Sequence, residues 1–337
     1  MTRTRGDAGA FLPPSFFDTM AIMTRVKWIW TAALLLASSE ATAQAEESAP
    51  RGGGKPGVGE RHVLVAAHRG GYANDRGDGA PENSVANVEA AVRKGFDVYE
   101  TDIRRTADDV FVIVHDDTLD RETNGTGPVE DLTLDEVKKL RKRYRDGSLS
   151  DEPVATLEEL LVAGKERILF KPDLKPGTLQ HFAELAALIA GLEMEDQVFL
   201  RTRARDANAI ANHFAAGAPR VEVMFKVDRP KQVEAIDERF SPATIQINVA
   251  KGESLPEEKR EAIRLARERG IVVESHSYGD ESQWRELAEA GVRMFHTAVP
   301  GPTLEWLEAN GWREASSGAD ALRAGLRNAE WWAVAVE

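Results

Sequence analysis

Two histidines and a pair of acidic residues stand close together in this sequence: His68, Glu100, Asp102 and His115. Cleavage of a phosphodiester requires a base for the nucleophile, an acid for the departing alcohol, and positive charge beside the phosphate. Two imidazoles can act as the base and the acid, and a Glu-x-Asp pair can hold a hard divalent cation. Arg69, next to the first histidine, can bind phosphate oxygens. These residue types therefore point to phosphodiester chemistry.

The segments that must position these residues alternate between short, β-rich apolar runs and helical patterns. This alternation predicts parallel strands joined by crossover helices. The candidate strands are 64–68, 97–102, 111–115, 167–173, 197–201, 221–227, 244–248, 271–275 and 292–297. Helices are expected over 84–94, 179–191, 256–270 and 281–291, and the last three of these patterns end at a glycine.

The nine candidate strands are one more than an eight-stranded barrel needs. Only eight residues separate Asp102 from Phe111, whereas a parallel crossover needs about a dozen. The segment 103–114 is therefore expected to be a hairpin that turns at residues 107–110, with residue 102 opposite residue 115. Eight parallel strands remain, so the predicted fold is of the α/β class, a (β/α)8 TIM barrel with a short hairpin after its second strand.

The active sites of such barrels lie at the C-terminal ends of the strands. Four polar residues fall at such ends, namely His68, Asp102, Asp173 and His296. The hairpin returns His115 to the same rim, and Glu100 shares a strand face with the residue two positions later. A single histidine at a strand end is more often packed than catalytic. The convergence of several polar groups on one rim favours the functional interpretation.

Residues 65–127 resemble the N-terminal half of the glycerophosphodiester phosphodiesterase family. The matching features are HRG, PENS, E-x-D, T-x-D, HDDTLDR and T-x-G-x-G, in the order and spacing of that family. The segments 156–161 (TLEELL) and 173–175 (DLK) extend the match. Each motif is weak alone, but all of them in order form a strong signal. The resemblance implies a phosphoric diester hydrolase that acts on a small glycerophosphodiester.

Carried over to this sequence, the resemblance implies that Glu100, Asp102 and Asp173 bind a divalent cation, Mg²⁺ or Ca²⁺. The residue types agree, because three carboxylates at neighbouring strand ends would repel one another without a cation. The resemblance also implies that His68 and His115 are the acid and the base, with the order of their roles open.

The same resemblance implies roles for three further residues. Arg69 and Lys175 would bind phosphate oxygens, one through a guanidinium fork and the other through a point charge. Glu82, in the PENS segment, would support the metal or orient a histidine. In the implied reaction the adjacent hydroxyl of the glycerol moiety attacks phosphorus, one histidine protonates the departing alcohol, and water then opens the cyclic phosphate.

The C-terminal half departs from the family pattern. Residues 297–300 read TAVP where the family has Thr-Asp before a proline, and residues 276–279 read HSYG where it has an aromatic residue and Thr-Val-Asn. The hairpin turn has Asp109 where the family favours glycine. These changes leave the metal-binding and acid–base residues intact but alter one wall of the pocket.

The remaining histidines and one lysine divide by position. His276 and His296 follow the last two strands and could line the pocket. Lys226 is a further phosphate-binding candidate. Three histidines are expected at the surface, His62 in the linker and His181 and His213 on helices.

The composition excludes several classes of protein. A formal net charge of −13 and the lack of a basic stripe argue against a nucleic-acid partner. The chain has no cysteine, so disulfides and thiolate metal sites are excluded, and any metal must be held by oxygen and nitrogen ligands.

The N-terminal region reads as an export signal. Residues 1–45 are expected to be an upstream extension and a signal peptide that starts at Met20 or Met23, with an apolar run over 28–37 that is too short to span a bilayer. The mature chain is then expected to be periplasmic or secreted and to have no stable membrane span. The other expected boundaries are a flexible linker over 46–61, the barrel over 62–312, and a C-terminal tail over 313–337.

Two other functions remain open at this point. The altered C-terminal wall is compatible with a hydrolase of lysophospholipids or of another cell-envelope phosphodiester, for which an apolar groove beside the metal site would be the sign. A barrel that binds phosphate-bearing ligands without catalysis is the third possibility. The presence of both histidines and all three carboxylates argues against it, because a binding protein needs no acid–base pair.

Overall fold

Eight parallel strands close into a barrel in the computed structural model, which describes residues 61–72, 80–313 and 318–327. They are β1 (Leu64–Ala67), β2 (Val98–Arg105), β6 (Leu169–Leu174), β7 (Phe199–Arg203), β8 (Glu222–Lys226), β9 (Thr244–Gln246), β10 (Val272–Ser277) and β11 (Met294–Thr297). Their order around the barrel is β1-β11-β10-β9-β8-β7-β6-β2, and pairing of β1 with β2 closes it. The predicted TIM barrel is confirmed.

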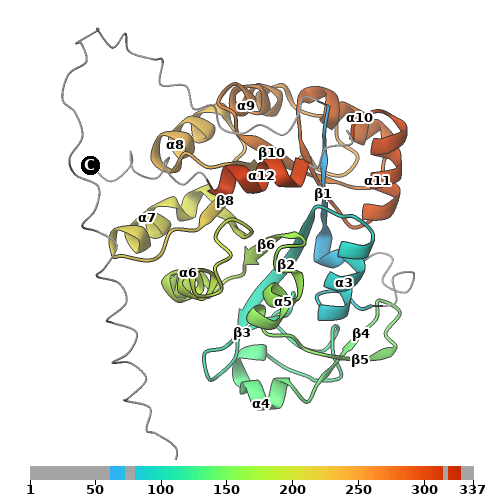
Figure 1. Cartoon of the computed structure of the whole chain (residues 1–337), viewed down its shortest axis with the longest axis vertical. Coiled ribbons are helices and arrows are strands. Elements are labelled where there is room, and N and C mark those ends of the chain that lie inside the picture. The colour runs from blue at the N-terminus through green and yellow to red at the C-terminus, as the bar shows by residue number, and fades with distance from the viewer. Residues whose placement is uncertain (1–60, 73–79, 314–317, 328–337) are drawn as a thin grey trace, which may run out of the picture. The chain divides into compact units, whose positions relative to one another are not determined.

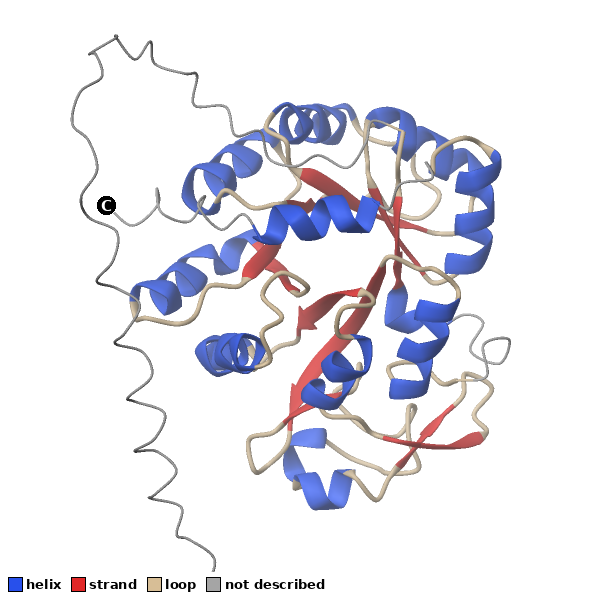
Figure 2. Cartoon of the chain, viewed as in Figure 1, coloured by secondary structure: helices blue, strands red, loops and turns tan. Residues whose placement is uncertain are grey.

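Helices lie outside the ring of strands, as Figures 1 and 2 show. They are α3 (Val85–Arg93), α5 (Leu157–Gly164), α6 (Phe182–Gly191), α7 (Ala207–Ala215), α8 (Pro230–Phe240), α9 (Glu257–Glu268), α10 (Glu281–Ala290) and α11 (Pro300–Ala309). Short 3-10 turns precede two of them, η4 (Leu179–His181) and η5 (Ala204–Asp206). Local sequence sets where these helices begin. Ser84 caps α3, and Thr156 with Glu159 forms a capping box at α5.

The predicted hairpin exists, but its register is one residue off. Strand β3 (Phe111–Ile113) pairs antiparallel with the end of β2, and Ile103 lies opposite Ile113. This pairing sets residue 102 opposite 114 rather than 115. The reason is a three-residue loop in which Asp109 adopts a left-handed φ of 67°, a common alternative to the two-residue turn. A slip of one residue reverses the side-chain faces, so His115 is not directly opposite Asp102.

The segment between β3 and α5 forms a small insertion with a core of its own. It contains η3 (Val129–Asp131), α4 (Leu134–Val137), β4 (Arg141–Arg143) and β5 (Leu149–Pro153). Its core side chains are Val114, Leu119, Val129, Val137 and Val154, which pack together with Val112 of β3. The β4–β5 hairpin was not predicted, although Asp146-Gly147 is a typical hairpin turn sequence. This insertion holds the loop that carries His115.

Helix α12 (Gly318–Arg327) packs at the end of the barrel where the strands begin, and Figure 1 shows it in red in front of the strands. Its Leu322 and Leu326 join a buried cluster with side chains from the starts of the strands. Part of the predicted C-terminal tail is therefore a helix that covers the barrel. Residues 1–60, with the expected signal peptide and nearly all of the linker, and Trp331 and Trp332 lie outside the described residues.

The structure shows how exposed the three histidines expected at the surface are. His62 was expected at the surface, but only 2% of it is exposed, because it lies two residues before the buried strand β1 and next to the buried Val63. His181 and His213 are half-buried. Within the described residues, none of the helices has the length and apolar character needed to cross a membrane.

Candidate active site

A cavity of about 530 Å³ opens at the C-terminal ends of the barrel strands. Seven residues singled out by the sequence line it, namely His68, Arg69, Glu100, Asp102, His115, Asp173 and Lys175. Glu82 does not line the cavity, but its carboxylate accepts a hydrogen bond from Arg69, which does. Lys226, His276 and His296 also face the cavity. The topology thus brings together side chains that are more than two hundred residues apart.

Three carboxylates form a compact oxygen-donor group in this cavity. Glu100 and Asp102 come from β2 and Asp173 from β6, and the last two lie side by side in the parallel register. One oxygen of each lies within 4.8 Å of the others, a spacing at which a cation could be held. Carboxylate oxygens are the ligands that Mg²⁺ and Ca²⁺ prefer. The donor set therefore fits a hard divalent cation.

The side chains of the protein itself already neutralise these carboxylates. Lys175 Nζ lies 2.8 Å from Asp102 Oδ1, and Arg201 donates to Asp173 Oδ1 at 2.8 Å. Burial alone would lower the pKa of Lys175, but the two aspartates raise it above its usual value. The expectation that the carboxylates need a cation in order to coexist is therefore too strong. A bound cation would instead share or replace these contacts.

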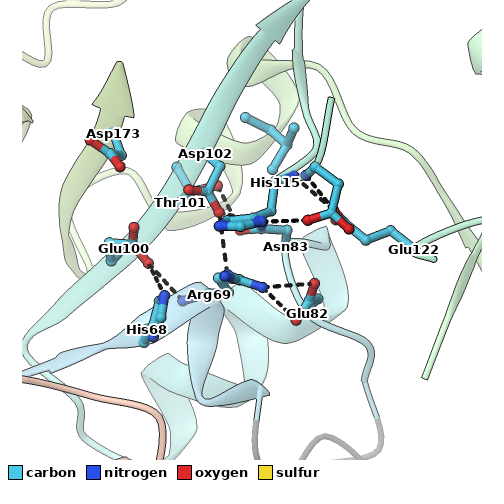
Figure 3. Close-up of polar contacts among 12 residues, drawn as sticks. His68, Arg69, Glu82, Asn83, Glu100, Thr101, Asp102, His115, Glu122 and Asp173 are labelled. Atoms are coloured by element: carbon cyan, nitrogen blue, oxygen red, sulfur yellow. Dashed lines mark hydrogen bonds and ion pairs between the residues drawn. The ribbon is translucent and has the colours of Figure 1, made fainter. Parts of the chain in front are cut away.

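The HRG segment brings Arg69 to the carboxylates. It forms a single 3-10 turn, η1 (His68–Gly70), in which Arg69 has a left-handed φ of 51°. A side chain at Gly70 would collide with Asn87, so glycine is required there. The backbone N–H of Arg69 donates to Glu100 Oε2 at 2.9 Å, and its guanidinium lies 3.3 Å from Glu82 and 3.5 Å from Asp102 (Figure 3). Such strained backbone is typical of functional sites.

His68 lies deep in the cavity beside the first carboxylate. Its Nε2 is 3.9 Å from Glu100 Oε2. Burial lowers the pKa of His68 below its usual value, with the charge of Glu100 acting in the opposite direction. A neutral imidazole in this position has a lone pair and could accept a proton.

His115 has a different environment, because the carboxylate of Asp116 is hydrogen-bonded to its ring. Its Nδ1 lies 2.6 Å from Asp116 Oδ1, and the backbone N–H groups of both residues donate to Glu122 Oε1 at 2.9 Å. Hydrogen bonding to Arg121 holds the pKa of Asp116 well below its usual range. Arg121 also pairs with Glu82 and Glu122. Arg121 thus joins these three carboxylates as their shared ion-pair partner.

The sequence did not identify Lys171 and Gln246, which line the cavity, or Glu274, which contacts both of them. Lys171 of β6 and Glu274 of β10 are both buried and form an ion pair at 2.6 Å across the barrel interior. Gln246 donates to the same carboxylate, and His296 packs beside it. A signal was present in the sequence, because each of these residues lies at an inward-facing position of its strand.

The chain is similar to one protein family along most of its length and to several of its members. The model of the "Glycerophosphoryl diester phosphodiesterase family" matches residues 68–301. A glycerophosphodiester phosphodiesterase of Caldanaerobacter subterraneus subsp. tengcongensis is 33% identical over 164 residues, which cover 46% of this chain and 65% of that protein. One from Bacillus subtilis is 26% identical over 259 residues, which cover 71% of this chain and 84% of the relative.

Solved structures of similar fold were also found. A glycerophosphoryl diester phosphodiesterase from Parabacteroides distasonis gives a TM-score of 0.66 at 24% identity, covering 77% of this chain and 90% of that one. A phosphodiesterase from Oleispira antarctica, solved in complex with the product sn-glycerol-3-phosphate, gives a TM-score of 0.59 at 20% identity over 73% of this chain and 97% of that one. These two similarities concern the fold.

Proposed function

The chain belongs to the glycerophosphoryl diester phosphodiesterase family, and we propose that it hydrolyses glycerophosphodiesters to glycerol phosphate and an alcohol with the help of a divalent cation. The observation that carries this proposal is the cavity in which the side chains of two histidines, Arg69, Lys175 and three carboxylates meet. The names of the relatives and the product bound to the Oleispira protein support the same reaction class.

Glu100, Asp102 and Asp173 are the proposed ligands of the cation, Mg²⁺ or Ca²⁺, because their oxygens converge and are of the type that such ions prefer. When bound, the ion would supply positive charge to the phosphate and polarise the attacking hydroxyl. Arg69 and Lys175 are the proposed phosphate-binding groups. Both lie beside Asp102 at the cavity wall, where they can contact phosphate oxygens.

The contacts of the two histidines suggest how the roles divide. We assign His68 as the base that takes the proton from the glycerol hydroxyl, since desolvation lowers the pKa of its ring and favours the neutral form. We assign His115 as the acid that protonates the departing alcohol, since the Asp116 carboxylate at its Nδ1 stabilises positive charge on the ring. The roles reverse when water opens the cyclic phosphate. Glu82 positions Arg69 and Arg121 rather than touching the substrate.

The lining of the cavity favours a small polar substrate over a lysophospholipid. Of the residues that line it, Val249, Ala250 and Tyr278 are the least polar, and the others are charged or carry amide or imidazole groups. An acyl chain would need a longer apolar groove. A role in binding alone is also disfavoured, because the Asp116 contact to His115 is of the kind that tunes a proton donor.

The proposal is tested by the products formed from two substrates. Purified protein with Mg²⁺ or Ca²⁺ is incubated with glycerophosphocholine and, separately, with lysophosphatidylcholine, and glycerol phosphate, choline and lysophosphatidic acid are measured. We expect glycerophosphocholine to yield glycerol phosphate and choline, and we expect no turnover of lysophosphatidylcholine. Turnover of the lysophospholipid alone would replace the proposal with the lysophospholipid hydrolase. Turnover of neither would favour the binding protein.

We also propose, from the sequence alone, that the chain is exported. The charged residues, apolar run and small-residue sites before Gln44 support this. Expression of the full chain in a bacterial host and N-terminal sequencing of the periplasmic product test it. Cleavage after Ala43 or within a few residues of it is expected, and an uncleaved chain that stays in the cytoplasm would contradict the proposal.

A further inference from the structure

His296 is a buried histidine for which the reaction above has no use. It comes from β11, only 5% of it is exposed, and neither of its ring nitrogens has a hydrogen-bond partner among the described residues. Buried polar groups are nearly always bonded to a partner, and an exception needs an explanation. The ring is fixed by packing between two other imidazoles, His68 at 4.5 Å and His276 at 4.3 Å between ring centroids.

Two imidazole nitrogens converge on one carboxylate oxygen at this point. His296 Nε2 lies 3.4 Å from Glu100 Oε2, and His68 Nε2 lies 3.9 Å from the same oxygen. One ligand atom from each of the three residues lies within 4.8 Å of the others. For bonds of about 2.0–2.2 Å, tetrahedral coordination places ligand atoms at similar separations. The ring nitrogen of His296, which has no hydrogen-bond partner among the described residues, thus lies within reach of a position that a metal ion could occupy.

We propose that His68, Glu100 and His296 form a second metal site, selective for ions that prefer imidazole, such as Zn²⁺. Two histidines and one glutamate, with a fourth position open, form a known type of zinc ligand set. The carboxylate group of Glu100, Asp102 and Asp173 offers oxygen only and suits a hard cation. Glu100 belongs to both groups, so the two sites share one wall.

The second site has a consequence for activity, and this part rests on the proposed function. A metal ion bound to His68 Nε2 occupies the lone pair that would accept the proton of the glycerol hydroxyl. Zn²⁺ should therefore inhibit an enzyme that is saturated with Mg²⁺, without first removing the Mg²⁺. The rate of hydrolysis would then depend on the Zn²⁺ concentration, because Zn²⁺ would block His68, the proposed base.

Binding of Co²⁺ to the purified protein tests the site without any turnover, because imidazole-bound Co²⁺ absorbs visible light. We expect Co²⁺ absorption that Zn²⁺ abolishes and Mg²⁺ does not. His296→Gln and His296→Phe should each weaken Co²⁺ binding at least about tenfold. Two matched variants should keep it, His276→Gln, which changes the neighbouring imidazole, and Asp173→Asn, which changes only the carboxylate group. Circular dichroism checks that each variant is folded.

Three results would overturn the proposal. They are the absence of Co²⁺ absorption in the unaltered protein, equal Co²⁺ affinity in the folded His296 variants, and loss of the absorption in Asp173→Asn, which would put the ion among the carboxylates. In a separate assay, the Zn²⁺ concentration that halves the Mg²⁺-supported rate should rise at least about tenfold in His296→Gln. A protein that binds Co²⁺ as expected but hydrolyses no glycerophosphodiester would refute the proposed function and leave the metal site standing.

Discussion

At the scale of single residues, the site contains two histidines in different environments. His68 is half-buried beside Arg69 and Glu100, and desolvation lowers its pKa. His115 is half-exposed and bonded to Asp116 through Nδ1. Enzymes commonly separate an acid from a base in this way, by giving two similar groups different surroundings. The sequence supplied both histidines, but only their neighbours distinguish the roles.

Loss of the proposed acid should nearly abolish hydrolysis. We expect His115→Ala to lower kcat/KM for glycerophosphocholine by about 10²- to 10⁴-fold, the usual contribution of general acid–base catalysis. His181→Ala is the matched control, because His181 is a half-buried histidine on η4 that does not line the cavity. Steady-state kinetics of both variants check this. Equal activity of the two variants would remove His115 from the mechanism.

The carboxylate that is hydrogen-bonded to His115 should be needed for full activity. Arg121 keeps Asp116 ionised over the whole working range. Asp116→Asn keeps the shape of the side chain but removes the negative charge beside His115 Nδ1, so kcat/KM for glycerophosphocholine should fall about 10- to 100-fold, the usual cost of losing a partner that orients a functional histidine. Asp117→Asn, a change at the exposed neighbouring position, should leave kcat/KM in place. Steady-state kinetics check both variants, and an unchanged kcat/KM in Asp116→Asn would contradict the assigned role.

At the scale of elements, the position of His115 is set by the hairpin of β2 and β3 and by the insertion that follows it. Together they place His115 at the cavity. The insertion is joined to the rest of the fold by the fully buried Lys142 of β4, whose Nζ donates to Asn83 O at 3.2 Å. Within the insertion, Lys142 pairs with Glu122 at 3.3 Å. Glu122 in turn accepts the backbone N–H of His115. The position of the proposed acid thus depends on a core that lies outside the barrel.

The buried pair Lys171–Glu274 ties β6 to β10 through the barrel interior, and its loss should be costly. Lys171→Met leaves the Glu274 carboxylate buried without its partner, so the free energy of unfolding should fall by about 3–5 kcal/mol. The double variant Lys171→Met/Glu274→Met, which removes both charges, should be more stable than the single variant. Urea unfolding measures both. A single variant within 1 kcal/mol of the unaltered protein would show that the pair is unimportant.

The sequence predicted the barrel because its strands and helices alternate with a clear period, and it predicted most of the site because strand ends carry the polar residues. It failed where tertiary packing decides. The hairpin register depends on one left-handed residue, Asp109, and His62 is buried although the sequence places it at the end of a linker. Arg201 and Lys171 were missed because their contacts come from strands distant in the sequence.

At the scale of the molecule, the two ends of the barrel have separate tasks. The C-terminal ends of the strands hold the charged cavity, and the N-terminal ends form an apolar cluster that α12 covers. TIM barrels commonly separate activity from stability in this way. Changes at the covered end should therefore alter stability and leave the chemistry intact.

A substitution that creates a cavity under α12 tests this separation of stability from activity. Leu322 is 1% exposed, and Leu322→Ala should lower the free energy of unfolding by about 2–5 kcal/mol. At a temperature where the variant stays folded, kcat/KM should not change, because the site lies at the other end of the barrel. Leu149→Ala, at a position that is 49% exposed, is the control and should change neither quantity. A large loss of kcat/KM in folded Leu322→Ala would show that the two ends are coupled.

Glycerol phosphate release from glycerophosphocholine, measured with and without chelation, tests whether hydrolysis in this cavity depends on a cation. We expect activity that EDTA abolishes and that Mg²⁺ or Ca²⁺ restores, and we expect Asp173→Asn to lose this restoration. Full activity in EDTA after exhaustive dialysis, or full restoration in Asp173→Asn, would contradict a cation site among the carboxylates.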